Sequence, residues 1–402
     1  MSITRYLEKH GKTMPLPIPS DRTFRYAVVI PSMAESEGLP ETLRSLAANS
    51  GLMLEDTLTL VVVNRRPDSP PEIRDDNEKV LQILRDNPFA LPNLHYLDLV
   101  TEHGVGGARK TGMDTALLYL DHSVNPLLLC LDADTLVEPD YLRAAAQLRT
   151  QPGAIVNFRH RMPEEPALRR AIVEYELFMR YYVLGLRWAK SPYAFHALGS
   201  AMICRAADYV RCGGMRERNG GEDFYFLQSL RKLGPIGFIG NTTIYPAGRL
   251  SDRVDFGTGP RLRKLINGEK QEFYHFGIFI ELKKIIAAAD SDPDENLPER
   301  LAGQFRPETR DFFQLQGFPA AWPKIYRNTP KTPEARRRAF HTWLDGFRTL
   351  KLIHYLEQNA PMLGRLDYRH ACAMLLEYYG RGGSEAADPV RFLAELRSLD
   401  NH

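Results

Sequence analysis

Two aspartates, Asp132 and Asp134, directly follow the apolar run Leu127–Leu131. Carboxylate oxygens are ligands that suit Mg²⁺ and Mn²⁺, and a buried strand ahead of the pair would hold both carboxylates at one edge of a sheet. The same spacing recurs at Asp290 and Asp292 in a stretch typical of a solvated linker, so the spacing alone decides little. The alternative is a polar turn that caps the next helix, and we favour the metal site.

A second pair of acids, Glu222 and Asp223, comes after Gly220 and Gly221 and before an apolar helical stripe. Adjacent glycines allow a backbone to lie close to a ligand, and a carboxylate at that place could remove a proton from an acceptor hydroxyl. The helix dipole offers another explanation, because it favours acids in a first turn by about 0.3–1 kcal/mol. The two interpretations are evenly balanced for this motif alone.

Basic side chains accompany two glycine-rich segments. Arg109 and Lys110 lie within Gly104–Gly112, whose backbone amides at a helix start would suit a diphosphate. Tight packing of the helix on the sheet is an equal alternative for Gly112.

Arg249 and Arg253 precede the glycine loop of residues 256–259. The guanidinium fork fits phosphate oxygens, so this segment could form a lid over a diphosphate. For either arginine taken singly, an ordinary surface turn is the favoured interpretation.

The elements that must position these groups alternate between apolar runs and helical patterns. Strands are expected at Tyr26–Ile30, Leu58–Val63 and Leu127–Leu131, with helices between them. Continuously apolar strands separated by helices predict an α/β fold with a mostly parallel sheet covered on both faces. Ligands of such sheets bind beyond the carboxyl ends of the strands, which directs attention to Pro31–Glu37 and Asn64–Asp68.

The chain divides into three predicted regions: an N-terminal extension over residues 1–24, an α/β domain over 25–261, and a mostly α-helical region over 262–402. Prolines at 15, 17 and 19 limit regular structure in the extension.

Composition excludes several classes of protein. The chain of 402 residues has a net charge of +2 and is 44% hydrophobic, so nucleic acid is not an expected partner. Four cysteines without a Cys-x-x-Cys pair indicate reduced, buried thiols. No secretory signal and no apolar run near the roughly 20 residues of a membrane span occur. We expect a cytoplasmic protein that would meet a membrane only peripherally, at its inner face.

Taken in order, four segments resemble the family-2 glycosyltransferases of the GT-A fold, over roughly residues 25–250. The matching segments are Val28–Ser32 with Glu35, Gly107–Gly112, Leu131–Asp134, and Gly213–Gly214 followed by Gly221–Asp223. The resemblance implies a GT-A domain, to which the helical patterns after residue 261 add an α-helical C-terminal extension. It also implies an inverting transfer of a sugar from a nucleotide-sugar to an acceptor hydroxyl, with Mn²⁺ or Mg²⁺ as cofactor.

The resemblance also implies roles for individual residues. Pro31, Ser32 and Glu35 would lie beside the nucleoside. Arg109, Arg249 and Arg253 are donor-binding candidates on their own chemistry, because a guanidinium group fits phosphate oxygens. Asp132 would reach the ribose or sugar and the cation, and Asp134 would hold the cation on the diphosphate. Asp223 would be the general base, Glu222 would support it or bind the acceptor, and Ser200 would line the acceptor side.

Two departures from the family pattern bear on substrates. An Asp pair often follows the second strand in the family, whereas this strand ends in Asn64-Arg-Arg-Pro-Asp68. A UDP-sugar is favoured and a GDP-sugar stays open. The Gln-x-x-Arg-Trp segment of polymer synthases is missing, as are membrane spans. We therefore expect a single, non-processive transfer to a soluble or peripherally reached glycan, lipid or small molecule.

Two other functions remain as alternatives. A retaining GT-A glycosyltransferase would share the Asp-x-Asp segment but would not need Asp223 as a base. A non-catalytic nucleotide-binding or scaffold protein could keep a degenerate transferase core. The presence of Asp132, Asp134 and Asp223 argues against a degenerate core, because clustered carboxylates repel one another and a site without function would be expected to lose them.

Overall fold

The computed structural model describes residues 2–218, 220–250, 258–291, 293–382 and 388–401. The chain forms two compact units. The first comprises residues 1–172 and 197–264, and the second comprises residues 173–196 and 265–402. Residues 173–196, within the range predicted for the α/β domain, thus pack with the C-terminal region.

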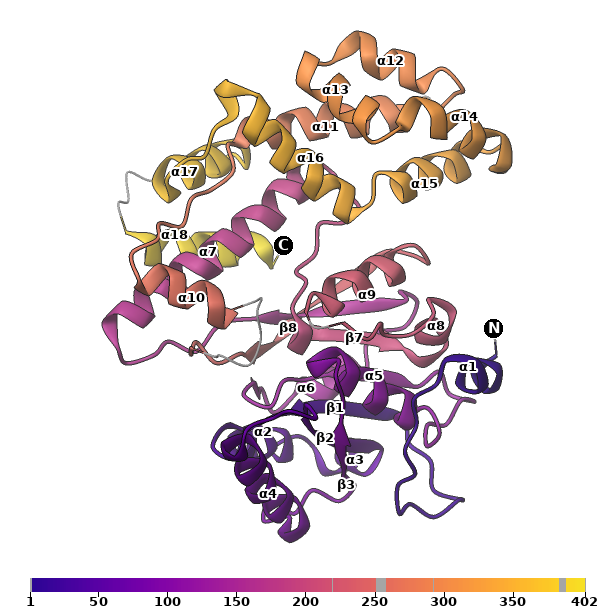
Figure 1. Cartoon of the computed structure of the whole chain (residues 1–402), viewed down its shortest axis with the longest axis vertical. Coiled ribbons are helices and arrows are strands. Elements are labelled where there is room, and N and C mark those ends of the chain that lie inside the picture. Colours follow the sequence, from indigo (N-terminus) through magenta and orange to yellow (C-terminus); the bar gives the residue numbers. More distant parts are fainter. Residues whose placement is uncertain (1, 219, 251–257, 292, 383–387, 402) are drawn as a thin grey trace. The chain divides into compact units, whose positions relative to one another are not determined.

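The first unit is built on one eight-stranded sheet (Figure 1). Its strands are β1 (Tyr26–Ser32), β2 (Thr57–Arg65), β3 (Leu94–Val100), β4 (Leu127–Cys130), β5 (Leu136–Val137), β6 (Gly153–Phe158), β7 (Met202–Arg205) and β8 (Ile236–Tyr245). Its helices are α1 (Ile3–His10), α2 (Gly38–Ala47), α3 (Gly51–Glu55), α4 (Pro71–Asp86), α5 (Gly104–Ala116), α6 (Tyr141–Ala145), the short η1 (Gly199–Ala201), α8 (Ala206–Arg211) and α9 (Glu222–Arg231). Helix α7 (Pro166–Trp188) begins in this unit and continues into the second, as α10 (Thr258–Ile266) also does.

The strand order is β3-β2-β1-β4-β7-β6-β8-β5. Strands β1 to β4 pair in parallel, whereas β7 runs antiparallel between β4 and β6, so the sheet is mixed. Every residue of β1 is buried, as expected for an apolar strand with both faces covered. The predicted α/β class with a mostly parallel sheet and a helical C-terminal region is confirmed.

The N-terminal extension contains a helix that sequence analysis did not predict. Helix α1 carries Tyr6, which is fully buried and donates a hydrogen bond of 2.9 Å to Asp114 on α5. The Lys12 amide donates to the other oxygen of Asp114 at 2.9 Å. The extension is therefore fastened to α5 by a buried carboxylate.

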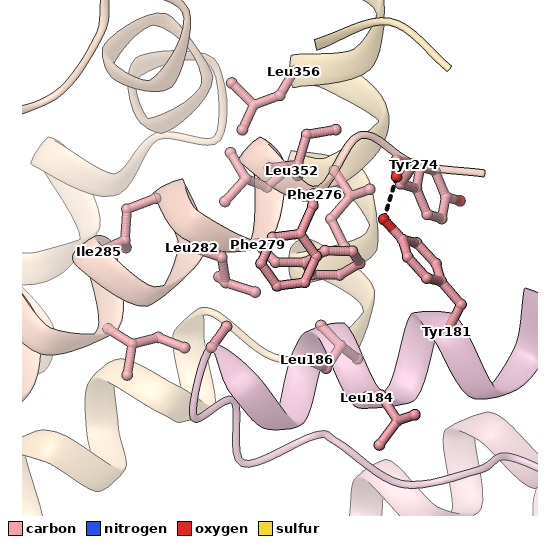
Figure 2. Packing of buried hydrophobic residues seen from close by; sticks show 14 of the residues in the cluster. Tyr181, Leu184, Leu186, Tyr274, Phe276, Phe279, Leu282, Ile285, Leu352 and Leu356 are labelled. Carbon is pink, nitrogen blue, oxygen red and sulfur yellow. Dashed lines mark hydrogen bonds between the residues drawn. The ribbon is translucent and has the colours of Figure 1, made fainter. Parts of the chain in front are cut away.

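The second unit consists of helices. Besides the shared α7 and α10 they are α11 (Phe276–Ser291), α12 (Leu297–Gln304), α13 (Pro307–Leu315), α14 (Phe318–Asn328), α15 (Pro333–Trp343), α16 (Gly346–Asn359), the short η2 (Pro361–Leu363), α17 (Tyr368–Tyr378) and α18 (Pro389–Asp400). Its core joins the aromatic side of α7 to α11 and α16 (Figure 2). Tyr181 lies edge-on to Phe279 and donates a hydrogen bond of 2.6 Å to the Tyr274 carbonyl. This packing explains why residues 173–196 belong to the second unit.

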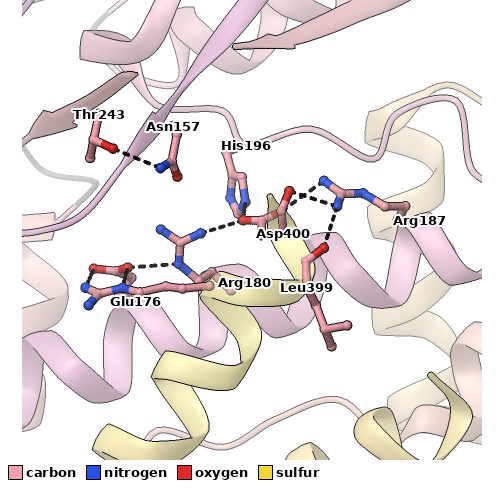
Figure 3. Close-up of polar contacts among 9 residues, drawn as sticks. Asn157, Glu176, Arg180, Arg187, His196, Thr243, Leu399 and Asp400 are labelled. Atoms are coloured by element: carbon pink, nitrogen blue, oxygen red, sulfur yellow. Dashed lines mark hydrogen bonds and ion pairs between the residues drawn. The ribbon is translucent and has the colours of Figure 1, made fainter. Parts of the chain in front are cut away.

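A buried ionic network ties the last described helix to α7 within the second unit (Figure 3). Asp400, whose side chain is fully buried, accepts hydrogen bonds from Arg180 at 2.6 Å and from Arg187 at 2.9 Å. His196 lies 2.7 Å from the same carboxylate. Glu176 pairs with both Arg180 and Arg397 at 2.8 Å.

None of the described helices is long and apolar enough to cross a membrane.

Candidate active site

The candidate site lies where the parallel strands end. In the parallel register, Ser32 on β1 is opposite Val63 on β2, and Cys130 on β4 is opposite Val29 on β1. Asp132 and Asp134 follow β4 directly, so they leave the sheet at the edge reached by Ser32 and by Asn64 at the end of β2. The sheet thus gathers three of the predicted segments at its carboxyl edge.

Arg109 on α5 is the central cation of the site. Its buried guanidinium donates to Glu222 through Nη1 and to Asp132 through Nη2, so it joins α5, α9 and the segment after β4. Burial alone would lower the pKa of Arg109, but the carboxylates of Asp132 and Glu222 raise it above its ordinary value. The guanidinium therefore stays charged and keeps its two acids in place.

A glycine makes room for this guanidinium. A Cβ built on Gly199 of η1 would collide with the Arg109 guanidinium group. The neighbouring Ser200 side chain is buried, and its Oγ has no hydrogen-bond partner in the described part of the chain. The segment predicted to line the acceptor side is thus packed directly on the central arginine, with one polar atom left for a ligand.

Asp223 has the most perturbed carboxyl group of the site. It lies in the first turn of α9, whose N-cap Gly221 has a φ of 68°, a conformation that favours glycine. Burial raises the pKa of Asp223 to about 7, and the adjacent Glu222 charge adds to the rise, while Arg109 opposes it. Its Oδ1 accepts the Phe224 amide at 2.7 Å. A carboxylate with a pKa near 7 can take a proton from a hydroxyl at neutral pH.

Asp132 has a raised pKa as well. Burial is the largest cause, the Arg109 charge opposes it, and the Asp134 charge adds to it. The side chain is still one third exposed, at 33%. Asp132 therefore presents a carboxylate edge to the site while the other oxygen is held by Arg109.

Arg249 forms a second charged cluster with two predicted site residues. Its Nε donates to Asp134 at 2.8 Å, and its Nη2 donates to Glu35. Burial alone would lower the pKa of Arg249, but Asp134 and Glu35 raise it. A Cβ built on Gly38 would lie 2.9 Å from Glu35 Oε2, so glycine there leaves space for this cluster.

Three further predicted residues lie at the carboxyl ends of β1 and β2. Ser32 is buried, and its Oγ has no hydrogen-bond partner among the described residues. Pro31 adjoins it on β1, and Asn64 is buried at the end of β2. Arg253 lies outside the described residues.

Lys110 does not lie beside Arg109's partners. It donates instead to Asp114 at 2.8 Å and to Tyr6 at 3.1 Å, so its charge is paired with a buried carboxylate of its own helix. The reason is helical geometry, because consecutive helical side chains point in different directions. A Cβ on Gly112 would strike Val29 and Val62, which supports the packing explanation for that glycine.

Sequence analysis missed three supporting residues. Asn77 on α4 accepts the Ala34 amide at 2.9 Å and donates to the Asn64 carbonyl at 3.1 Å. Asp76 accepts the Ser36 amide at 3.0 Å, and Arg161 donates to the Asp134 carbonyl at 3.0 Å. They brace the loops after β1, β2 and β4. No motif marks them, because polar residues on a helix or after a strand are ordinary at the sequence level.

The donor set suits a divalent cation that a diphosphate helps to bind. The described residues contain no cluster of three or more His, Cys, Asp or Glu side chains arranged to hold a metal. Mg²⁺ and similar ions are commonly bound by one or two carboxylates together with substrate phosphates. Asp134, aided by Asp132, fits that pattern.

Comparison with known proteins finds one family model that matches part of the chain. Residues 27–211 match the family model described as glycosyl transferase family 2. No curated protein matches the sequence. Among solved structures, S. aureus TarS 1-349 in complex with UDP-GlcNAc is 13% identical with a TM-score of 0.41, covering 94% of this chain and 89% of that one. The mannosyltransferase PcManGT from Pyrobaculum calidifontis, in complex with GDP-Man and Mn²⁺, is 14% identical with a TM-score of 0.38, covering 86% and 93%.

Proposed function

We propose that this glycosyltransferase, whose residues 27–211 match the family-2 model, inverts the anomeric centre of its donor sugar with Asp223 as general base. The observation that carries this proposal is the pKa of Asp223, raised to about 7 by burial and by Glu222. An acceptor hydroxyl would lose its proton to the Asp223 carboxylate as its oxygen attacks the anomeric carbon. The bond from that carbon to the donor phosphate oxygen breaks, and the nucleoside diphosphate leaves.

Arg109 and Glu222 prepare the base for this step. The ion pair to Arg109 holds Glu222 beside Asp223, and the Glu222 charge raises the pKa of Asp223. Arg109 also fixes Asp132, whose free edge would meet the donor sugar or ribose. The single arginine thus sets the spacing between the acceptor side and the donor side.

The donor nucleotide would occupy the carboxyl edge of β1 and β2. Ser32 offers a buried, unpartnered hydroxyl there, and Pro31, Glu35 and Asn64 surround the same edge. A UDP-sugar is the proposed donor, with a GDP-sugar as the alternative that a donor screen decides. The absence of a polymer-synthase Gln-x-x-Arg-Trp segment supports a single transfer.

Mn²⁺ or Mg²⁺ held by Asp134 and Asp132 would neutralise charge on the leaving diphosphate. Arg249 already lies on Asp134 and Glu35. It supplies a positive charge beside the place where the diphosphate would bind, and we assign it, with Arg253, to the diphosphate. Arg249 therefore balances the two acids before the donor and its cation arrive.

The test combines product stereochemistry with matched variants. Wild-type protein should give product of inverted anomeric configuration by NMR, and Asp223→Asn should lower kcat by about 10²–10⁴-fold while nucleotide binding persists. Asp134→Ala should lose the Mn²⁺-dependent part of nucleotide binding in calorimetry. Asp311→Asn, an exposed acid on α13, serves as the control. Retained configuration, or full activity of Asp223→Asn, would overturn the mechanism, and no nucleotide binding at all would overturn the donor assignment.

A further inference from the structure

The second unit contains a basic pocket that the proposed function does not use. It has a volume of about 490 Å³ and is lined by residues of α14, α15, the turn between them and the start of α16. Figure 1 labels these three helices. We propose that this pocket binds an organic phosphate, with the phosphate on Arg338 and Arg348 and an apolar or aromatic body against the lining formed by Ile325, Ala339 and Trp343. The inference does not depend on the glycosyltransferase mechanism, because the pocket lies wholly within the second unit.

Trp343 gives the pocket a rigid apolar wall. Only 6% of Trp343 is exposed, and its ring stacks on Phe313 with an interplanar angle of 20° and a centroid distance of 5.6 Å. Ile325 and Ala339 extend the apolar lining. Because Phe313 and the Arg348 guanidinium both lie against the Trp343 ring, a ligand would contact Trp343 together with Ile325 and Ala339 rather than stack on a free ring face. A lining held in place by its neighbours can take a ligand at little cost in side-chain entropy.

The two arginines of the pocket keep donors available. The Arg348 side chain donates to the Trp343 carbonyl at 2.7 Å, and its guanidinium lies 4.9 Å from the centre of the Trp343 ring. The Arg348 backbone amide donates to the Asp345 carboxylate at 3.0 Å. No described carboxylate forms an ion pair with Arg338 or Arg348. A guanidinium has five N–H donors in a planar fork that matches phosphate oxygens. Two guanidinium groups at one pocket suit a doubly charged phosphate ligand better than a singly charged carboxylate ligand.

The hydroxyl groups of the pocket are already used. Thr342 donates to the Arg338 carbonyl at 2.8 Å, and Thr329 donates to the Ile325 carbonyl at 2.7 Å. Neither hydroxyl has its hydrogen left for a ligand oxygen. A neutral polar ligand would therefore find few donors, whereas an anion would find the two arginines.

The surrounding surface has the same sign of charge. Between residues 318 and 348 the basic residues are Lys324, Arg327, Lys331, Arg336, Arg337, Arg338 and Arg348, and the acids are Glu334 and Asp345. Part of this charge has partners, since Arg337 donates to the Asp290 carbonyl at 2.6 Å. The remaining excess raises the local concentration of anions. The charge complements a phosphate, and the apolar wall complements the body that carries it.

The test is calorimetric titration of the full chain with phenyl phosphate, inorganic phosphate and benzyl alcohol. Phenyl phosphate should bind with one site per chain, about tenfold or more tightly than inorganic phosphate, because the ring buries apolar area against Ile325, Ala339 and Trp343. Arg338→Ala should weaken phenyl phosphate binding by about tenfold, the loss expected for one charged hydrogen bond. The Arg338 side chain is exposed and forms no described ion pair, so this variant should fold.

Arg327→Ala is the matched control, because Arg327 is exposed on α14 and outside the pocket lining. It should change binding by less than about twofold. Ala339→Trp, which fills the pocket without changing charge, should abolish binding of phenyl phosphate. Equal weakening by Arg327→Ala and Arg338→Ala would show an ordinary solvated basic face and overturn the site. Absence of saturable binding, or inorganic phosphate binding as tightly as phenyl phosphate, would overturn it as well.

Discussion

Arg109 and Glu222 form a buried ion pair between residues 113 positions apart in the sequence. The same guanidinium also holds Asp132, so one side chain connects the segment that follows β4 with the first turn of α9. These are the two segments proposed to hold the donor and the base. The geometry of the site therefore depends on Arg109, which contacts both segments, and on helix α5, which carries it.

Replacement of Arg109 should damage both folding and chemistry. Arg109→Gln leaves the Glu222 and Asp132 carboxylates without their cation, which for a buried pair costs about 3–5 kcal/mol in the free energy of unfolding. Arg109→Lys restores the charge without the fork, so it should recover stability better than activity. Chemical denaturation and kcat measured on both variants check this. Equal activity of the lysine variant and wild type would contradict the claim that activity depends on the contacts of Arg109 with both Glu222 and Asp132.

Gly199 should be intolerant of any side chain. Gly199→Ala would place a Cβ on the Arg109 guanidinium, so we expect kcat to fall by about tenfold or more as Arg109 shifts. Gly303→Ala is the matched control, because nothing lies within 4 Å of its added Cβ and it sits in helix α12. That control should keep full activity and gain up to about 1 kcal/mol of stability. An active Gly199→Ala would show that Arg109 has room to move without loss.

Arg249 should matter more for nucleotide binding than for stability. Its side chain is 37% exposed, so the ion pairs to Asp134 and Glu35 should contribute less than about 1 kcal/mol to stability. Arg249→Gln should weaken binding of a nucleoside diphosphate by about tenfold, because a charged hydrogen-bond donor is lost. Calorimetry with UDP and GDP, each with and without Mn²⁺, gives the effect. Unchanged affinity would remove Arg249 from the diphosphate site.

The positions of the candidate acids could be predicted, but their partners could not. The apolar run before Asp132 predicts a strand, and the parallel sheet then places Asp132 and Asp134 at the ligand-binding edge. Nothing in the sequence shows that Arg249 reaches Glu35, 214 residues away. Such contacts depend on how the chain returns to the sheet, which local patterns do not encode.

The N-terminal helix α1 and the bounds of the second unit could not be predicted from the sequence either. The prolines of residues 1–24 concealed the short helix α1, whose burial of Tyr6 depends on Asp114 of α5. The aromatic residues of α7 pack in a cluster with Phe273 and Phe279, residues much further along the chain. Both features depend on contacts between residues that are far apart in the sequence.

Asp400 should stabilise the second unit over a wide pH range. Burial opposes ionisation of Asp400, but His196, Arg180 and Arg187 outweigh it and lower its pKa to about 2. A carboxylate with a depressed pKa stabilises the fold above its unfolded pKa of about 4, and this stabilisation is lost as the pH falls towards 2. Asp400→Asn should therefore lower Tm at neutral pH.

The difference between the variant and wild type should shrink when both are measured below about pH 3. Scanning calorimetry from neutral to acidic pH follows this loss. Asp388→Asn, which removes the exposed N-cap acid of α18, is the control for a general effect on that helix. A pH-independent difference between Asp400→Asn and wild type would contradict the assigned ionisation.

The most direct test of the central claim is the pH dependence of kcat/KM, which reports the base in the free enzyme. Asp223 must be deprotonated to act as a base, so kcat/KM should rise with pH and level off above an apparent pKa of about 7. The residual activity of Asp223→Asn should lose that ascending limb. A profile that is flat from about pH 5 to about pH 9, or an ascending limb that persists unchanged in Asp223→Asn, would contradict the assignment of Asp223 as the general base.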